Sequence, residues 1–309
     1  MKRLIAAIFA VGLLSACAGV AAPGAAKSET PQQSLSTTGK AMKQVKSVKF
    51  DLNGTVNVTL PQALVDQLKA KGGSQAAILS SNMTVGLKAS GTVNRPDQLQ
   101  ATIDASLNGG ALKIETQVVA TGGNLYYKDP MSGNWKMVKR PAARGAFNGE
   151  SGTGAKKGAA KLSYQTVLDT AKSVTEVNGS SATMDGTTVD HYQVVPDLVK
   201  LFNQISADHG SSNSAAMAAL QTVLQNATLT ADVWTGTGDH LIRRFSYDAS
   251  VSADLHQLAA AMPQGASSRA SAPALTLPAG SIAQVTAHIV IDLHDYNRPV
   301  TIKAPAVTG

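Results

Sequence analysis

The chain has 309 residues, with 27 basic and 20 acidic side chains, a net charge of +7 and only 4% aromatic residues. This mild basic bias comes without the arginine-rich stripe and interleaved aromatic residues of a nucleic-acid-binding surface, so nucleic acid is not an expected partner. Because the chain contains a single cysteine, it forms no internal disulfide, and its stability has to come from a buried core.

The amino terminus has the layout of an export signal. Lys2 and Arg3 precede an apolar segment at residues 4–14, and small residues then flank Cys17. The apolar segment is shorter than the about 20 residues that a membrane-spanning helix needs. The stretch Leu14-Ser15-Ala16-Cys17 resembles the lipobox of bacterial lipoproteins. This resemblance implies a signal peptide over residues 1–17, a lipid anchor on Cys17 and a position on the extracytoplasmic face of a cell membrane. An ordinary secreted protein whose signal happens to end in cysteine is the alternative.

Residues 18–38 are rich in Ala, Gly, Pro, Ser, Thr and Gln, and they predict a flexible tether about 25 Å in extent. A single folded domain is predicted over residues 39–309, beginning with a short helix at 39–46.

The first half of this domain is predicted to be a meander of antiparallel strands. Apolar and polar residues alternate at 48–60, 83–93, 99–107 and 112–120, with turn residues after the second and third of these runs. Two short strands are predicted at 124–128 and 134–138, and one short helix at 62–71. The strand of thirteen residues at 48–60 is unusually long, which predicts a strongly twisted or curved sheet with one apolar face.

The second half mixes helices with further strands. Apolar residues recur at helical spacing weakly over 162–174 and more clearly over 198–205 and 217–224, which predicts helices. Asp185-Gly186 predicts a hairpin turn. Strands are expected at 229–233, 241–253 and 285–293, the last of them long, followed by a short edge strand at 299–303. The segments 142–161 and 263–280 show no hydrophobic period and are interpreted as loops.

The order of these elements resembles the LppX and LprG family of bacterial lipoproteins, and more distantly the lipoprotein carrier LolA. The most specific parts are the lipobox, the stretch Asn124-Leu125-Tyr126-Tyr127 followed by Trp135, and the terminal stretch 292–302. The resemblance implies an α+β fold in which a strongly curved antiparallel sheet, a half-barrel, has helices packed on its concave face. It also implies an apolar cavity for acylated lipids.

Apolar residues of the strand faces and of the two helical stripes form the candidate lining of that cavity. Aromatic residues are scarce, so few bulky side chains are available to fill a curved sheet. The candidate lining residues are Val56, Val58, Leu87, Ile103, Ile114, Val118, Leu201, Phe202, Leu220, Leu224, Phe245, Ile289 and Ile291. Lys156, Lys157 and Lys161 are candidates for holding an anionic head group at its mouth.

Signatures of catalysis are missing from the sequence. Gly149 and Gly154 have the spacing of a P-loop, but Ala155 stands where the lysine should follow. No G-x-S-x-G motif occurs, and strand geometry puts His288 and His294 about 20 Å apart, too far for one metal ion. We therefore expect no enzyme, cofactor or metal, and instead a membrane-anchored envelope protein that binds an acylated lipid or lipoglycan, with an envelope lipid transporter as a candidate partner. A structural or sensory lipoprotein with a filled core is the alternative, and an envelope enzyme on the same fold is a weaker one.

Overall fold

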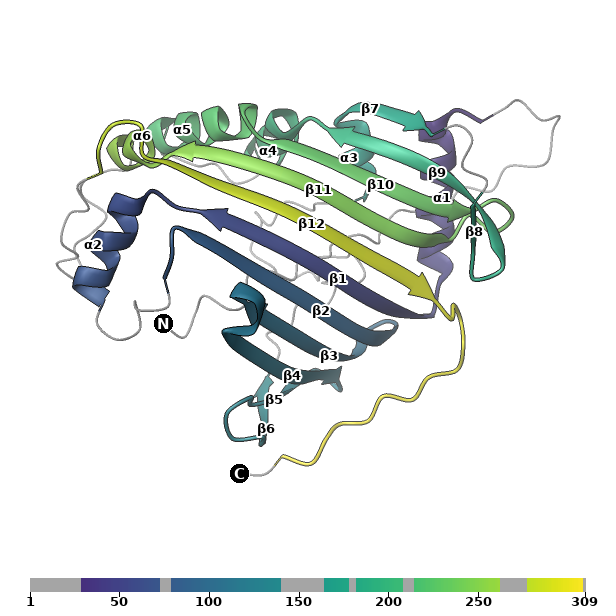
Figure 1. Ribbon diagram of the computed structural model, residues 1–309. Helices are drawn as coiled ribbons and strands as arrows, with labels where there is room; N and C mark the ends of the chain where they lie inside the picture. The colour runs from purple at the N-terminus through teal and green to yellow at the C-terminus, as the bar shows by residue number, and fades with distance from the viewer. Residues whose placement is uncertain are drawn as a thin grey trace.

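The computed structural model describes residues 29–72, 79–139, 164–177, 182–207, 214–261 and 277–307, and twelve strands in these ranges form one sheet (Figure 1). In chain order the elements are α1 (Pro31–Gln44), β1 (Ser47–Thr59), α2 (Gln62–Gly72), β2 (Asn82–Asn94), β3 (Gln98–Leu107), the 3-10 turn η2 (Asn108–Gly110), β4 (Leu112–Thr121), β5 (Asn124–Lys128), β6 (Trp135–Lys139), α3 (Tyr164–Asp169), β7 (Ala171–Glu176), β8 (Ala182–Met184), β9 (Thr187–Pro196), α4 (Leu198–Ala207), α5 (Ser214–Gln225), β10 (Thr228–Gly236), β11 (Ile242–Asp254), α6 (Leu255–Ala261) and β12 (Ile282–His294).

The sheet is antiparallel throughout, and its strand order is β6-β5-β4-β3-β2-β1-β12-β11-β10-β9-β7, with β8 paired to β9. The pair β1 and β12 lies in the middle and joins the two ends of the described chain. Each half of the sequence therefore supplies one side of a continuous sheet. That residues 39–309 behave as a single cooperative domain stays a prediction.

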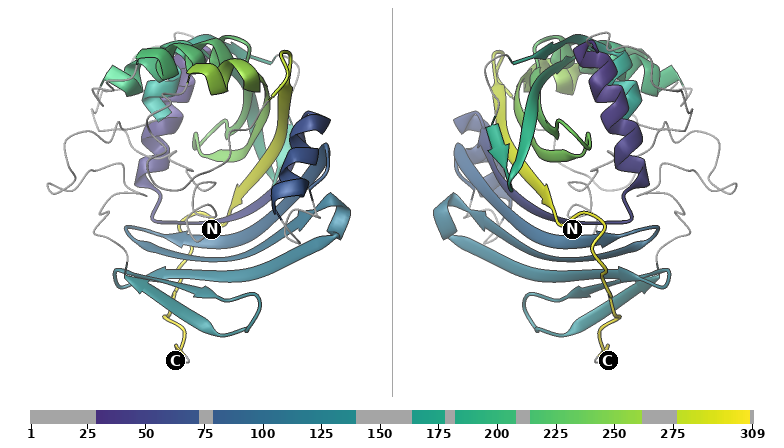
Figure 2. Two further views of the ribbon diagram at one scale, coloured as in Figure 1. Left: turned by 90° about the vertical axis from the view of Figure 1, so that its left-hand side faces the viewer. Right: turned by 90° about the vertical axis from the view of Figure 1, so that its right-hand side faces the viewer.

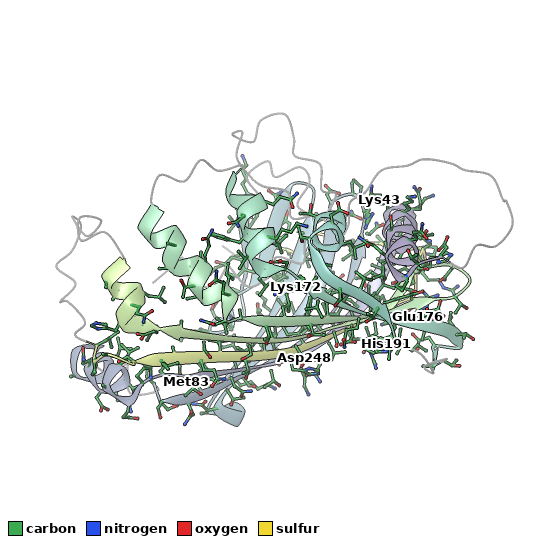
Figure 3. The ribbon with its side chains drawn as sticks, turned by 90° about the horizontal axis from the view of Figure 1, so that it is seen from above. Lys43, Met83, Lys172, Glu176, His191 and Asp248 are labelled. Atoms are coloured by element: carbon green, nitrogen blue, oxygen red, sulfur yellow. The ribbon has the colours of Figure 1, made fainter. Side chains whose placement is uncertain are left out.

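The sheet is open and curls into a half-barrel, which Figure 2 shows end-on. Helix α1 crosses its open side, and α4, α5 and α6 lie together beyond β11 on the concave side, as the view from above in Figure 3 also shows. Helices α5 and α6 contact β11, and α4 packs on α5. The predicted fold class, a curved antiparallel sheet with helices on its concave face, is confirmed.

The main core fills the concave side at the end of the sheet that α1 covers. Leu35 and Met42 of α1 are fully buried there against Tyr192, Val233 and Phe245 of strands β9 to β11. Neighbouring strands lie close around Gly91, where an added Cβ would lie 2.9 Å from the ring of Phe50 and 2.4 Å from the carbonyl oxygen of Gln100. Glycine at this position permits the close approach of strands β2 and β3.

Helix α1 begins earlier than the sequence indicated. It begins at Pro31, where Thr30 and Gln33 form a reciprocal capping box, and not at residue 39. The side chains of Leu35 and Thr38 are buried. The prediction of a tether over residues 18–38 is therefore wrong for residues 31–38, because polar residues between the buried positions concealed an amphipathic helix. Residues 18–28 of the tether lie outside the described residues.

Two other segments differ from their predictions. Residues 171–174, expected as helix, belong to β7, because the helix α3 ends at Asp169 and the chain then pairs with β9. Residues 299–303, expected as an edge strand, form no strand. Instead, Val300 and Ile302 pack on Val119 and Tyr126, on the face of β4 and β5 opposite the concave side. Helix α6 was not predicted, and the loop expected at 142–161 lies outside the described residues, as do residues 263–276 of the second loop.

Candidate functional site

One face of the sheet carries an apolar surface that runs along six neighbouring strands. On β1 this face is formed by every second residue from Val48 to Val58. The strand register places the apolar residues of β2, β3, β4, β11 and β12 on the same face. Because α1 packs on this face through Phe245, it is the concave face of the half-barrel.

The concave face is packed at one end and open at the other. Near its middle Leu52 and Ile291, which lie directly opposite each other, are 7% and 8% exposed. Toward the Thr59 end of β1, Val56 and Val58 are only half-buried. Leu112, Ile114 and Val285 on the neighbouring strands are 46%, 37% and 37% exposed. The apolar side chains thus become steadily less covered from the α1 end to the α2 end of the same strands. We call the less covered part, formed by Val56, Val58, Val85, Leu112, Ile114 and Val285, the open half.

The helices α4 and α5 are apolar but bury none of their described side chains. Leu201, Phe202 and Leu224 are half-buried, and Leu220 is 40% exposed. The two helices hold each other in part through the side-chain amide of Gln221, which donates to Asn203 at 2.7 Å. In a globular core such apolar helices would normally bury one face completely. The helices on this side therefore carry apolar surface that the described chain does not fully cover.

The predicted lining residues of the strands share one face but differ in how far they are buried. The register places all nine of the predicted strand residues on the concave face. Phe245 and Ile291, however, are buried within the packed core, where Phe245 meets the Tyr247 ring edge-on at 4.4 Å. Ile103, Leu87 and Ile289 pack against the edge of that core and are half-buried. Val56, Val58 and Val118 are half-buried without belonging to either buried cluster, and Ile114 is 37% exposed. That any of these residues contacts a lipid stays a prediction.

Some residues of the open half were missed. Val85, Leu112 and Val285 lie on the concave face beside Val56, Ile114 and Val58, and alternation alone already placed them on an apolar strand face. What the sequence could not indicate was their exposure, because this depends on where the helices lie. Cys17 and the three lysines at 156, 157 and 161 lie outside the described residues.

On the convex face of β1, β11 and β12, acidic and basic side chains pair between neighbouring strands. The Nδ1 atom of His288 lies 2.7 Å from Asp248 Oδ1, and the Nε2 atom of His294 lies 3.0 Å from Asp51 Oδ2. Asp292 instead pairs with Arg244, whose Nε is 2.6 Å from Asp292 Oδ1. Among the described residues, no three His, Cys, Asp or Glu side chains are grouped so that they could hold a metal ion.

A shallow hollow of about 340 Å³ lies on this convex face, around β1, β2 and β3. Its walls are mostly polar and come from Lys49, Asp51, Ser90, Thr92, Thr102 and His294. Both basic side chains of the lining are already engaged, since Lys49 pairs with Asp295 at 2.8 Å and His294 with Asp51. The hydrogen bond from Lys49 holds the pKa of Asp295 below its ordinary value. The hollow thus has no unpaired basic side chain for an anion, and its apolar lining is limited to Phe50, Gly91 and Ala101.

No helix within the described ranges is both long and apolar enough to cross a membrane.

Comparison with known proteins gives similar solved structures but no matching family. No family model matches the chain, and no curated protein matches it. The chain is similar to the lipoprotein LppX of Mycobacterium tuberculosis, with 12% identity, 88% of this chain and 98% of that chain covered, and a TM-score of 0.37. It is similar to LprF of Mycobacterium bovis, with 16% identity, 89% and 97% covered, and a TM-score of 0.40.

A third similar structure is a putative outer membrane lipoprotein-sorting protein domain of Vibrio parahaemolyticus, with 8% identity, 87% and 93% covered, and a TM-score of 0.22. These similarities agree with the resemblance expected from the sequence. At such low identities and TM-scores they do not indicate what this chain binds, so its function has to be argued from its own residues.

Proposed function

We propose that this chain is a membrane-anchored envelope lipoprotein that binds acylated lipids on the concave face of its half-barrel and carries or presents them. The observation that carries this proposal is the incomplete burial of the open half. Apolar side chains such as Val58, Ile114 and Val285 remain partly uncovered on a face that is tightly packed further along the same strands.

Acyl chains suit such a surface for a simple physical reason. Each methylene group that leaves water contributes about 0.8 kcal/mol, so binding needs no charged or catalytic group inside the site. An acyl chain is also long and narrow, so its shape matches a strip of apolar residues that runs along adjacent strands. Leu201, Phe202, Leu220 and Leu224 on α4 and α5 would contact the lipid from the helical side.

The proposal also includes where the protein is located and which partner it has. An acylated Cys17 would hold the protein on the extracytoplasmic face of the membrane, and two or three acyl chains anchor a protein firmly where one does not. An envelope lipid transporter is the proposed partner that would supply or receive the ligand. No acid, base and nucleophile converge on the concave face among the described residues, so we do not propose a reaction there.

The test is native mass spectrometry of the protein purified from its host under mild conditions. We expect a mass above that of the anchored chain, and release of a non-covalent acylated lipid when the protein is denatured. If the host-purified protein carries no lipid, and the delipidated protein takes up none from vesicles, the proposal is overturned. The filled-core alternative would then be favoured.

A further inference from the structure

The hairpin formed by β5 and β6 presents an apolar side chain to solvent at its tip. Met131 lies in the turn between the two strands and is 97% exposed. Met137 and Val138 on β6 are about half-exposed. The hairpin lies at the edge of the sheet, away from α4, α5 and α6 (Figure 1). Met137 and Val138 lie on opposite faces of β6, so Met131 is the apolar residue at the tip itself. A single exposed apolar side chain is unremarkable by itself, and what distinguishes Met131 is how the turn holds it.

The exposure of Met131 does not come from a loose turn. One carboxylate oxygen of Asp129 accepts hydrogen bonds from the backbone N–H groups of Met131 and Ser132 at 2.9 and 3.1 Å. The backbone N–H of Asp129 donates to the carbonyl of Asn134, and the carbonyl of Asp129 accepts from the N–H of Gly133. Lys136 forms an ion pair with the same carboxylate, and these contacts hold the pKa of Asp129 well below its ordinary value. A rigid turn thus holds the methionine away from the protein.

The hairpin is also basic. Residues 124–139 contain Lys128, Lys136 and Lys139 and a single acidic residue, Asp129, which gives a net charge of +2. An apolar tip with flanking lysines is complementary to a membrane surface that contains anionic lipids, where the lysines remain near the head groups. A second copy of the chain would pair with the backbone of β6, at the edge of the sheet, and would leave the Met131 turn uncovered.

The hairpin is continuous with the open half of the concave face. The hydroxyl of Thr116 on β4 donates to the carbonyl of Lys128, the last residue of β5, at 2.6 Å. Thr116 is two residues from Ile114 on β4, so the start of the turn lies close to the open half. A membrane that touched the tip would therefore lie near Ile114 and Leu112, the most exposed apolar residues of that strand.

We infer that the β5–β6 hairpin is a membrane-docking element that inserts Met131 at the surface of an anionic bilayer. Docking is distinct from lipid uptake and does not require it, so either can fail without the other. If both hold, the hairpin would place the open half of the site beside the lipids of the membrane.

The experiment places a polarity-sensitive fluorophore on the tip of the full chain. A Met131→Cys substitution is made together with Cys17→Ser, so that the introduced cysteine is the only thiol to label. The probe membranes are vesicles of phosphatidylcholine with or without phosphatidylglycerol and with a lipid-borne quencher. A Thr237→Cys label in the exposed turn between β10 and β11 is the matched control position.

With phosphatidylglycerol present, we expect a blue shift and quenching for the label at 131 and neither for the label at 237. Adding Lys128→Gln should weaken this insertion about fivefold, whereas Lys40→Gln on α1 should not change it. The inference is overturned if the label at 131 stays in water, whether or not the chain floats with the vesicles. It is equally overturned if the shift occurs without vesicles at high protein concentration, which would indicate a second copy, or if insertion is the same without phosphatidylglycerol.

Discussion

Val58 on β1 lies directly opposite Val285 on β12, and Val285 leaves 37% of its surface exposed although both residues belong to the apolar concave face. Six residues earlier on β1, Leu52 lies opposite Ile291 in the same strand pair, and both are buried. The two pairs have similar chemistry and the same register. What differs is the cover, because Leu52 and Ile291 belong to a second buried cluster beside the core around α1, whereas Val58 and Val285 belong to neither cluster.

The division between packed and open halves predicts opposite responses to a large side chain. Val56 lies between Val85 and Ala287, and all three are half-buried, so Val56→Trp should occupy the open half with little loss of stability. Ala89 lies between Leu52 and Ile103 in the core, so Ala89→Trp should overpack it and cost about 1–3 kcal/mol or more.

Thermal unfolding and lipid uptake measured on both variants check this prediction. We expect Val56→Trp to fold normally and take up less lipid, because the indole occupies space that the acyl chain needs. If Val56→Trp is destabilised as strongly as Ala89→Trp, the concave face is filled along its whole length.

The lipid anchor predicts a specific loss of acylation. Cys17→Ala removes the thiol that would carry the thioether-linked diacylglycerol, so cells fed a labelled palmitate should no longer label this protein. Membrane fractionation together with the mass of the processed chain provides the second measurement. A Cys17→Ala chain that is cut after its signal and remains in the membrane would show that another feature holds it there.

The carboxyl-terminal segment predicts a stability effect far from the concave face. Ile302 is 5% exposed and packs on Val119 and Tyr126, so Ile302→Ala should lower the free energy of unfolding by about 2–5 kcal/mol. Thr301→Ala, at an exposed neighbouring position, should change it by less than about 0.5 kcal/mol. Denaturant unfolding distinguishes the two, and equal effects would mean that the segment does not hold the outer face of β4 and β5.

The sequence predicted the strands well because burial on one face imposes a period of two. The run from Val48 to Val58 shows this period without interruption, and the structure has β1 at Ser47–Thr59. The length of that strand indicated a curved sheet, and the resemblance to known lipoproteins added the half-barrel with helices on its concave face. Hairpin turns such as Asp185-Gly186 were equally clear, because both residues adopt positive φ angles that this dipeptide favours.

Features that depend on contacts distant in sequence could not be predicted. Residues 299–303 look like a strand, but their apolar side chains pack across β4 and β5 and not beside an edge. Phe245 and Val58 have the same alternation in the sequence, yet Phe245 is covered by α1 and its neighbours while Val58 is not. Local pattern identifies the apolar face, and only the placement of the helices decides which part of it stays uncovered.

Burial of Tyr247 predicts a loss of stability at alkaline pH. Its side chain lies on the concave face between Ala231 and Ile289, and burial raises the pKa of the phenol from about 10 to about 12. The folded protein therefore holds the proton more tightly than the unfolded chain does. This contribution to stability is complete below pH 10 and is lost as the pH rises toward 12, by about 1.4 kcal/mol per pH unit.

The check is urea unfolding of the wild type and of Tyr247→Phe at a series of alkaline pH values. The variant keeps the ring that packs on Phe245 but has no proton to lose, so its stability should fall less steeply above pH 10. Burial also raises the pKa of Tyr296, so the variant should retain part of the alkaline loss. Near neutral pH, where both tyrosines are protonated, the two proteins should differ little. Parallel curves above pH 10 would show that water reaches Tyr247 in the folded state, and that the uncovered part of the concave face extends further toward α1 than Leu52 and Ile291 indicate.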